Sequence, residues 1–167
     1  YRLGSNVTSL KIGDPVMALL TGGAYAEFAV AHAELFLTFP KTLTFVQAAA
    51  VPESYFTVWS NVFQIGQLKK DEVFLVHGGS SGVGSTAIQL ASSMGAKVFT
   101  TARTKEKCDT CVRLGALRAI NYQSEDFVEV TKQHTHGHGA DVILDMVGGN
   151  YFPRNLNLLA RFGRLVH

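Results

Sequence analysis

The chain has 167 residues, of which 47% are hydrophobic and 17% charged, and its formal net charge is +2 at pH 7. This composition is typical of a globular domain and excludes a disordered or fibrous chain, while the small net charge predicts no surface for nucleic acid or an anionic membrane. The two cysteines, Cys108 and Cys111, are too few for a disulfide framework or a four-cysteine zinc site. No apolar run approaches the ~18 residues of a membrane span, so we expect a soluble, cytoplasmic protein.

The first 44 residues contain turn residues and short apolar runs. A Gly-Asp-Pro turn at 13–15 precedes one apolar run, and a Gly-Gly pair at 22–23 precedes another. This pattern predicts short strands and no helix. Because the sequence begins at Tyr1 in a polar turn and stops at His167 within an expected strand, we expect it to be a piece of a longer polypeptide.

Helical patterns begin at Thr44, which has Gln47 three residues later, the spacing of a capping box. We expect Pro52 to interrupt this helix and a second helix to span residues 54–64. From residue 72 onward, strands alternate with helices, an order that predicts a parallel sheet covered on both faces. The expected strands are residues 72–77, 97–101, 117–122, 140–147 and 163–167.

The helices between these strands are expected to start after a glycine-rich turn, at Thr104, at Ser124 and near residue 150. The first of them should end at Gly95, and its apolar residues Val83, Ala87, Leu90, Ala91 and Met94 should fall on one face. The fold class predicted is α/β, a doubly wound parallel (Rossmann) sheet. Five of its six strands lie in the chain, so the last strand is expected beyond His167.

The glycine-rich turn, "HGGSSGVG" at residues 77–84, follows an apolar strand and opens an amphipathic helix. Counted back from its last glycine it reads Gly79-x-Ser81-x-x-Gly84, which departs from the dinucleotide fingerprint G-x-G-x-x-G at the middle position. Ser81 keeps its amide and adds a hydroxyl donor, provided that its φ is negative. The context favours a pyrophosphate site, with a plain structural turn as the alternative.

The residues after the second strand indicate which dinucleotide would bind. The segment "TTARTKEK" has no acid at the end of the strand, where an Asp or Glu would bind a free ribose hydroxyl. It carries Arg103, Lys105 and Lys107 instead, and a guanidinium can donate two hydrogen bonds to a 2′-phosphate. We therefore expect NADPH rather than NADH, the alternative being that the lysines, Lys105 above all, only form a solvated helix face.

With these motifs in hand, the sequence resembles the quinone oxidoreductase branch of the medium-chain dehydrogenase/reductases. The matching segments, in the order and spacing of that family, are "KIGDPVMALL", "GGAYAEF", "QAAAVPESYFTVW", "HGGSSGVG", "LGA", "INYQSEDF" and "ILDMVGG". The resemblance implies two domains: residues 1–44 as the tail of a GroES-like catalytic domain and residues 45–167 as the NADPH-binding domain.

The resemblance also assigns residues to the parts of a bound cofactor. Thr57 and Glu53 should lie near the nicotinamide, and Gly82, Val83 and Gly84 should line the pyrophosphate. Arg103, Lys107 and Tyr122 should surround the 2′-phosphate, and Val147 and Gly148 the inner edge of the cofactor. Position 103 is often small in the family, so an arginine there is a departure, and Tyr122 has the alternative of a partly buried strand-end aromatic.

A metal is not expected. Relatives that oxidise alcohols have a zinc-binding cysteine four residues before the threonine matched by Thr57, and this chain has Glu53 there. The segment "HTHGHG", with His134, His136 and His138, would at most bind a metal ion adventitiously, because it falls in a loop where relatives have variable polar residues. Cys108 and Cys111 begin several residues into a helix, whereas a redox pair needs its first thiol at the helix start. His77 is interpreted as a packing residue and not as a base.

The predicted reaction is hydride transfer from NADPH to a quinone or related conjugated carbonyl, by a protein that is a homodimer at full length. Two alternatives remain within the superfamily: an enone or enoyl thioester reductase, or a zinc-dependent alcohol dehydrogenase. A third is a non-enzymatic role like that of zeta-crystallins, as a structural or RNA-binding protein, which the nearly neutral charge disfavours.

Overall fold

The computed structural model describes residues 2–167, which divide into two compact units, one ending at Phe56 and the other beginning at Thr57. The first unit holds a two-stranded antiparallel sheet of β1 (Val16–Met17) and β2 (Leu37–Thr38) and one turn of 3-10 helix, η1 (Ala33–Leu35). The strand expected after the Gly-Gly pair at 22–23 is wrong, since residues 24–31 form none. The apolar side chains there are exposed, so no buried face or partner strand stabilises a ladder.

The capping box predicted at Thr44 is confirmed at the start of α1 (Phe45–Ala49). The Gln47 amide donates to the Thr44 hydroxyl over 3.2 Å, and the Thr44 amide donates to the Gln47 side chain over 2.9 Å. The next helix, α2 (Val51–Val58), starts earlier than predicted and continues as a π-helical segment, η2 (Trp59–Ile65). Pro52 fits there because the first turn of a helix has no use for its missing amide hydrogen.

The second unit is built on a five-stranded parallel sheet in the order β5-β4-β3-β6-β7. This confirms the predicted α/β Rossmann-type architecture, because that order belongs to a doubly wound sheet. The strands are β3 (Val73–Val76), β4 (Lys97–Ala102), β5 (Arg118–Asn121), β6 (Ala140–Leu144) and β7 (Leu159–Val166).

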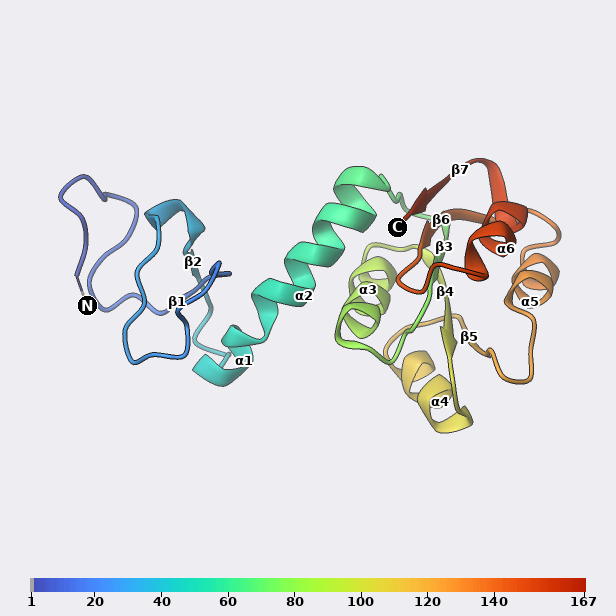
Figure 1. Ribbon diagram of the computed structural model, residues 1–167, viewed down its shortest axis with the longest axis horizontal. Coiled ribbons are helices and arrows are strands. Elements are labelled where there is room, and N and C mark those ends of the chain that lie inside the picture. The colour runs from blue at the N-terminus through green and yellow to red at the C-terminus, as the bar shows by residue number, and fades with distance from the viewer. Residues whose placement is uncertain (1) are drawn as a thin grey trace. The chain divides into compact units, whose positions relative to one another are not determined.

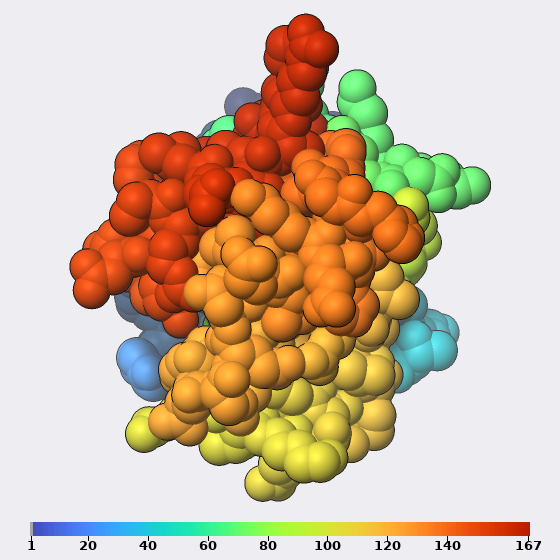
Figure 2. All heavy atoms as spheres, turned by 90° about the vertical axis from the view of Figure 1, so that its right-hand side faces the viewer, coloured from blue at the N-terminus to red at the C-terminus, as the bar shows by residue number. Residues whose placement is uncertain are grey.

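Helices cover both faces of this sheet (Figure 1). On one face α3 (Gly82–Ser93) and α4 (Lys105–Arg113) bury a core that includes Phe74, Val76 and Ile88. On the other, α5 (Phe127–His134) and α6 (Tyr151–Leu158) cover Leu75, Phe99 and Ile143. Figure 2 looks onto this second face, where the orange and red atoms of the later elements hide the sheet. Burial on both faces explains why β3 reads as an unbroken apolar run.

Local details confirm some helix ends and correct others. Gly95 (φ +83°) and Gly115 (φ +115°) take the left-handed conformation that ends α3 and α4. Met94 is the C-cap that follows α3, and its side chain is 46% exposed, so it is not part of the buried core beneath that helix.

The predicted cap Ser124 is also wrong, because Asp126 caps α5 by accepting the amides of Val128 and Glu129 over 2.8 and 3.2 Å. The chain before it is held by Glu125, which pairs with Arg118. Because of this ion pair, the helix begins only at Phe127, later in the sequence than predicted.

Candidate functional site

The glycine turn between β3 and α3 needs glycine at three positions. Gly78 has a φ of +71°, in the left-handed region. A Cβ on Gly79 would lie 2.1 Å from the Thr100 hydroxyl, and one on Gly84 would lie 2.2 Å from the Gly78 carbonyl oxygen. The sequence motif, counted from Gly79, missed Gly78, although the Gly-Gly pair could have indicated it.

Ser81 is the N-cap of α3, with a φ of −79°, which meets the condition set for it by the motif. Its hydroxyl oxygen accepts the Gly84 amide over 3.0 Å, and its own amide donates to the Gly78 carbonyl over 2.9 Å. The amide predicted to serve a phosphate is therefore used inside the turn. Only the hydroxyl hydrogen of Ser81 remains able to donate outward.

The amides of Gly82 and Val83 are the next two in the turn, and within residues 2–167 they have no hydrogen-bond acceptor. They are the first residues of a 12-residue helix, whose dipole places partial positive charge at this end. Two unpaired amides at such a position form a binding place for an anion such as a phosphate group.

Cations lie along the same carboxyl edge of the sheet. Ala102, the last residue of β4, lies opposite Asn121, the last residue of β5. Arg103 and Tyr122 therefore follow the ends of two adjacent strands. Lys107 follows in the first turn of α4.

The ion pairs of the described residues include neither Arg103 nor Lys107, whereas Lys105 is bound to Asp109 over 2.7 Å. This favours the solvated-face interpretation for Lys105 alone.

The loop after β6 completes this edge. Asp145 accepts the amides of Val147 and Gly148 over 2.8 and 3.0 Å, and Gly148 has a φ of +67°. Because β6 pairs with β3, this loop emerges next to the end of the strand that leads to the glycine turn. The roles of Thr57 and Glu53, both on α2, stay predictions.

The interpretation of His77 as a packing residue agrees with its complete burial between the rings of Phe127 and Tyr151. Burial lowers the pKa of His77, so the ring is neutral. Its hydrogen bonds to Thr101 and Asn155 were not apparent from the sequence.

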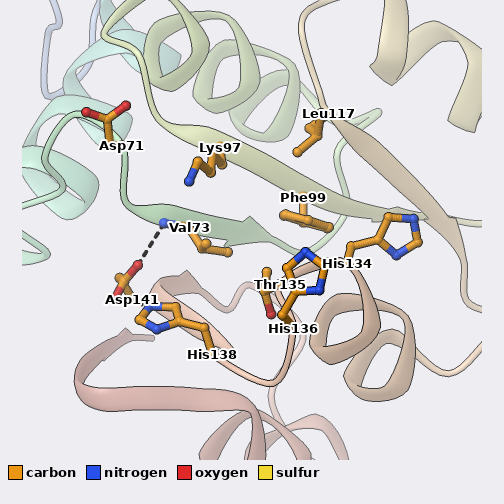
Figure 3. Close-up of a pocket in the computed structure, with 10 residues that line it drawn as sticks. All are labelled: Asp71, Val73, Lys97, Phe99, Leu117, His134, Thr135, His136, His138 and Asp141. Carbon is orange, nitrogen blue, oxygen red and sulfur yellow. Dashed lines mark hydrogen bonds and ion pairs between the residues drawn. The ribbon is translucent and has the colours of Figure 1, made fainter.

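The opposite, amino edge of the sheet holds a cavity of about 500 Å³ (Figure 3). His134, His136 and His138 line it, but the ring of His134 bonds to the Val130 carbonyl, while His138 bonds to Asp141 over 2.9 Å. In the described part of the chain no three metal-ligating side chains gather. The described residues thus supply no zinc site.

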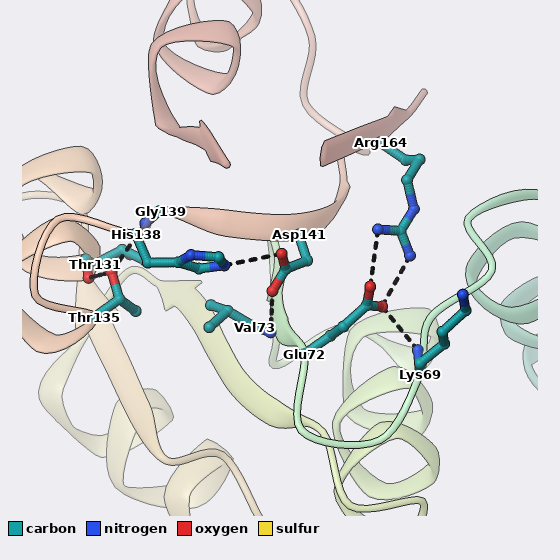
Figure 4. A network of polar contacts seen from close by, with 9 residues as sticks. All are labelled: Lys69, Glu72, Val73, Thr131, Thr135, His138, Gly139, Asp141 and Arg164. Carbon is teal, nitrogen blue, oxygen red and sulfur yellow. Dashed lines mark hydrogen bonds and ion pairs between the residues drawn. The ribbon is translucent and has the colours of Figure 1, made fainter. Parts of the chain in front are cut away.

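Charged groups at this edge bind one another and the backbone (Figure 4). Arg164 of β7 donates to both carboxylate oxygens of Glu72 over 3.0 and 2.8 Å, and Asp141 accepts the Val73 amide over 2.8 Å. Although burial alone would raise it, the Arg164 guanidinium and the Lys69 amide lower the pKa of Glu72. These contacts tie β7 to the segment before β3, and β6 to the start of β3.

Cys108 and Cys111 are buried and unbonded to each other, and burial raises the pKa of both thiols. A protonated, buried thiol is a poor nucleophile. This agrees with the expectation that the C-x-x-C spacing has no redox role.

Comparison with known proteins assigns the family. A family model described as zinc-binding dehydrogenase matches residues 82–167, just over half of the chain, so the chain belongs to that family. It is 34% identical to the quinone oxidoreductase of Sus scrofa over 165 residues, which are 98% of this chain and 50% of that protein. The predicted resemblance to quinone oxidoreductases of the medium-chain superfamily is confirmed.

Solved structures agree with this assignment. The chain matches an Escherichia coli quinone oxidoreductase complexed with NADPH with a TM-score of 0.85 and 36% identity, covering 98% of this chain and 51% of that one. It matches the CurK enoyl reductase with a TM-score of 0.89 and 31% identity, covering 98% and 49%. The chain thus spans about half the length of these three relatives. No described helix has the length and hydrophobicity to cross a bilayer.

Proposed function

We propose that this chain binds NADPH at the carboxyl edge of its parallel sheet and forms part of an oxidoreductase that reduces a quinone or related conjugated carbonyl. The observation that carries the proposal is the pair of unpaired amides at Gly82 and Val83. A pyrophosphate supplies the acceptors that these amides lack. Glycine at positions 79 and 84 keeps the turn in this shape, because a Cβ there would clash with the Thr100 hydroxyl or with the Gly78 carbonyl oxygen.

The preference for NADPH rests on charge. Arg103 and Lys107 have no ion-pair partner within residues 2–167, and no carboxylate ends β4. A 2′-phosphate would be bound there by charge-assisted hydrogen bonds, and Tyr122, the residue directly after the neighbouring strand β5, would supply a further hydroxyl. The NADPH complex of the E. coli relative supports this choice of cofactor.

The protein's part in the reaction is to bind and orient. NADPH, when bound, supplies the hydride. The amides of α3 would hold its pyrophosphate, the loop at Val147 and Gly148 would border its inner edge, and Thr57 and Glu53 would lie near the nicotinamide. An electron-poor quinone accepts hydride without a Lewis acid, so we propose a zinc-independent enzyme, supported by Glu53 where zinc-using relatives have cysteine.

A second candidate is the reduction of an enone or enoyl thioester. It is supported by the 31% identity and TM-score of 0.89 to the CurK enoyl reductase. We further propose that residues 45–167 form the nucleotide domain, that residues 1–44 belong to a GroES-like domain, and that the whole protein is a cytoplasmic homodimer.

Cofactor titration tests the proposal. We expect the protein to bind NADPH more tightly than NADH, and Arg103→Ala or Lys107→Ala to weaken NADPH binding by about tenfold each while leaving NADH binding unchanged. Lys105→Ala is the matched control, because that lysine already pairs with Asp109. Equal dissociation constants for the two cofactors would overturn the proposal. NADPH consumption with a panel of quinones and enoyl thioesters then separates the two candidate substrates.

A further inference from the structure

A row of polar side chains crosses the sheet at its carboxyl edge, within β4 and directly after β3 and β6. Val76 of β3 lies opposite Thr100 of β4 and Leu144 of β6. The next row across these strands is Thr101, His77 and Asp145. Since side chains of one row point to the same face of a parallel sheet, these three enter the core beneath α5 and α6.

The row is buried. His77 is 0%, Thr101 1% and Asp145 2% exposed, and Asn155 of α6 closes over them at 0%. The His77 ring packs edge-on against Phe127 and Tyr151, with ring centroids 4.8 Å away in each case. Polar groups so deep in a core are costly unless every one of them is hydrogen-bonded.

The donor and the acceptor of each hydrogen bond in this row can be assigned by starting from Asp145. Its carboxylate accepts from the Asn155 amide nitrogen over 2.9 Å. The Asn155 oxygen is therefore the atom that faces His77 Nε2 at 2.8 Å, and it can only accept. His77 must carry its proton on Nε2.

The other ring nitrogen is then a lone-pair acceptor. The Thr101 hydroxyl lies 3.1 Å from His77 Nδ1 and donates to it. The Thr101 oxygen in turn accepts the Gly78 amide over 3.2 Å. A protonated ring would donate through both nitrogens and leave the Thr101 hydroxyl without its acceptor.

This chain of bonds joins the two loops of the carboxyl edge. One end is the amide of Gly78, the left-handed residue of the glycine turn, and the other is Asp145, whose second oxygen accepts the amides of Val147 and Gly148. We propose that His77, as a neutral Nε2–H imidazole, is a positioning residue that holds the glycine turn and the 145–148 loop in register for one cofactor. This inference rests on the proposed NADPH binding.

The tautomer is tested in the protein without cofactor. Nitrogen NMR of labelled histidine should give His77 one protonated and one unprotonated ring nitrogen, with Nε2 protonated, through neutral and mildly acidic pH. A ring protonated on Nδ1, or on both nitrogens at neutral pH, would overturn the inference whatever the protein binds.

The role of His77 in linking the two loops is tested with a variant that has an aromatic ring but no ring nitrogen. We expect His77→Phe to weaken NADPH binding about tenfold and to speed hydrogen exchange at the Val147 and Gly148 amides, which the His77 side chain does not touch. Phe127→Leu is the matched control. It loosens the packing on the same ring but leaves every hydrogen bond between Asp145 and Gly78 in place. It should therefore change neither NADPH binding nor hydrogen exchange.

Thr101→Val serves as a second variant if His77→Phe does not fold, since it breaks the chain only at the glycine turn. It should weaken NADPH binding in the same way. If the unaltered protein does not bind NADPH, the proposed function itself fails. If the protein binds NADPH and these variants bind it as tightly, only the positioning role is overturned.

Discussion

The two edges of the parallel sheet carry similar polar groups and use them differently. At the carboxyl edge the amides of Gly82 and Val83 and the cations of Arg103 and Lys107 have no partners among the described residues. At the amino edge several charged groups are bound to one another or to the backbone, as Glu72 is to Arg164 and Asp141 is to the Val73 amide. Ligand binding requires groups that folding leaves unsatisfied, so charge alone does not locate a site.

A cavity does not locate it either. The amino edge has the hollow of about 500 Å³, with histidines on its wall, yet the ring of His134 bonds to the Val130 carbonyl and the ring of His138 to Asp141. The carboxyl edge has the backbone geometry of an anion site. Cofactor binding at the amino edge would contradict this difference, and variants that affect one edge and spare the other test it.

The largest effect is expected at Gly84. In Gly84→Ala the new Cβ would lie 2.2 Å from the Gly78 carbonyl oxygen and 2.7 Å from the Gly79 Cα, and backbone atoms cannot move aside. We expect a loss of about 3 kcal/mol in the free energy of unfolding, measured by urea denaturation, together with loss of NADPH binding. Gln89→Ala, exposed on the same helix, should leave both unchanged. A stable Gly84→Ala protein that binds NADPH would contradict the packing role.

The next effect is at the amino edge. Arg164 donates to Glu72 and to the carbonyls of Gly66 and Gln67. We expect Arg164→Met to cost about 2 kcal/mol in the free energy of unfolding without changing NADPH affinity, because these bonds lie away from the glycine turn. Arg161→Met on the same strand is the control. Weaker cofactor binding in Arg164→Met would mean that the two edges are not independent.

The comparison also explains what the sequence could predict. Several short-range patterns predicted the structure correctly: Thr44 with Gln47, the glycine ends of α3 and α4, and the alternation of strands and helices. Each depends on residues within one turn or on burial repeated along one element. The position of the glycine-rich turn at the start of α3 was predictable for the same reason, because its residues are contiguous.

Contacts between distant segments could not be predicted. His77 and Asn155 are 78 positions apart and meet only because β3 and α6 pack together. The cap of α5 is Asp126 and not the predicted Ser124, because Glu125 is bound to Arg118 of β5. In both cases tertiary packing determines which partner a polar side chain binds. A local sequence pattern does not contain that information.

A pH dependence of stability separates the buried row from the surface charges. Burial lowers the pKa of His77, while histidine in an unfolded chain titrates near about 6.5. Below that pH the unfolded state binds more protons, so stability falls as pH falls toward the lowered pKa, by at most about 1.4 kcal/mol per pH unit.

His77→Gln should reduce this slope in urea titrations between pH about 6.5 and 5. The carboxylates of Glu72 and Asp126, whose pKa values are lowered, lose their contribution only below about pH 4 and do not interfere. Equal slopes for the variant and the unaltered protein would show that His77 is not held neutral.

The smallest effect is expected at His138. Asp141 uses one oxygen for this half-exposed ring and the other for the buried strand amide of Val73. We expect His138→Ala to change the free energy of unfolding by about 0.5 kcal/mol or less, whereas Asp141→Ala, which leaves the Val73 amide unsatisfied, should cost about 1–2 kcal/mol. Chemical denaturation of the two variants compares them directly. If His138→Ala were the costlier change, the exposed histidine and not the backbone contact would be the group that stabilises this edge, and the distinction between the two edges would need a different physical basis.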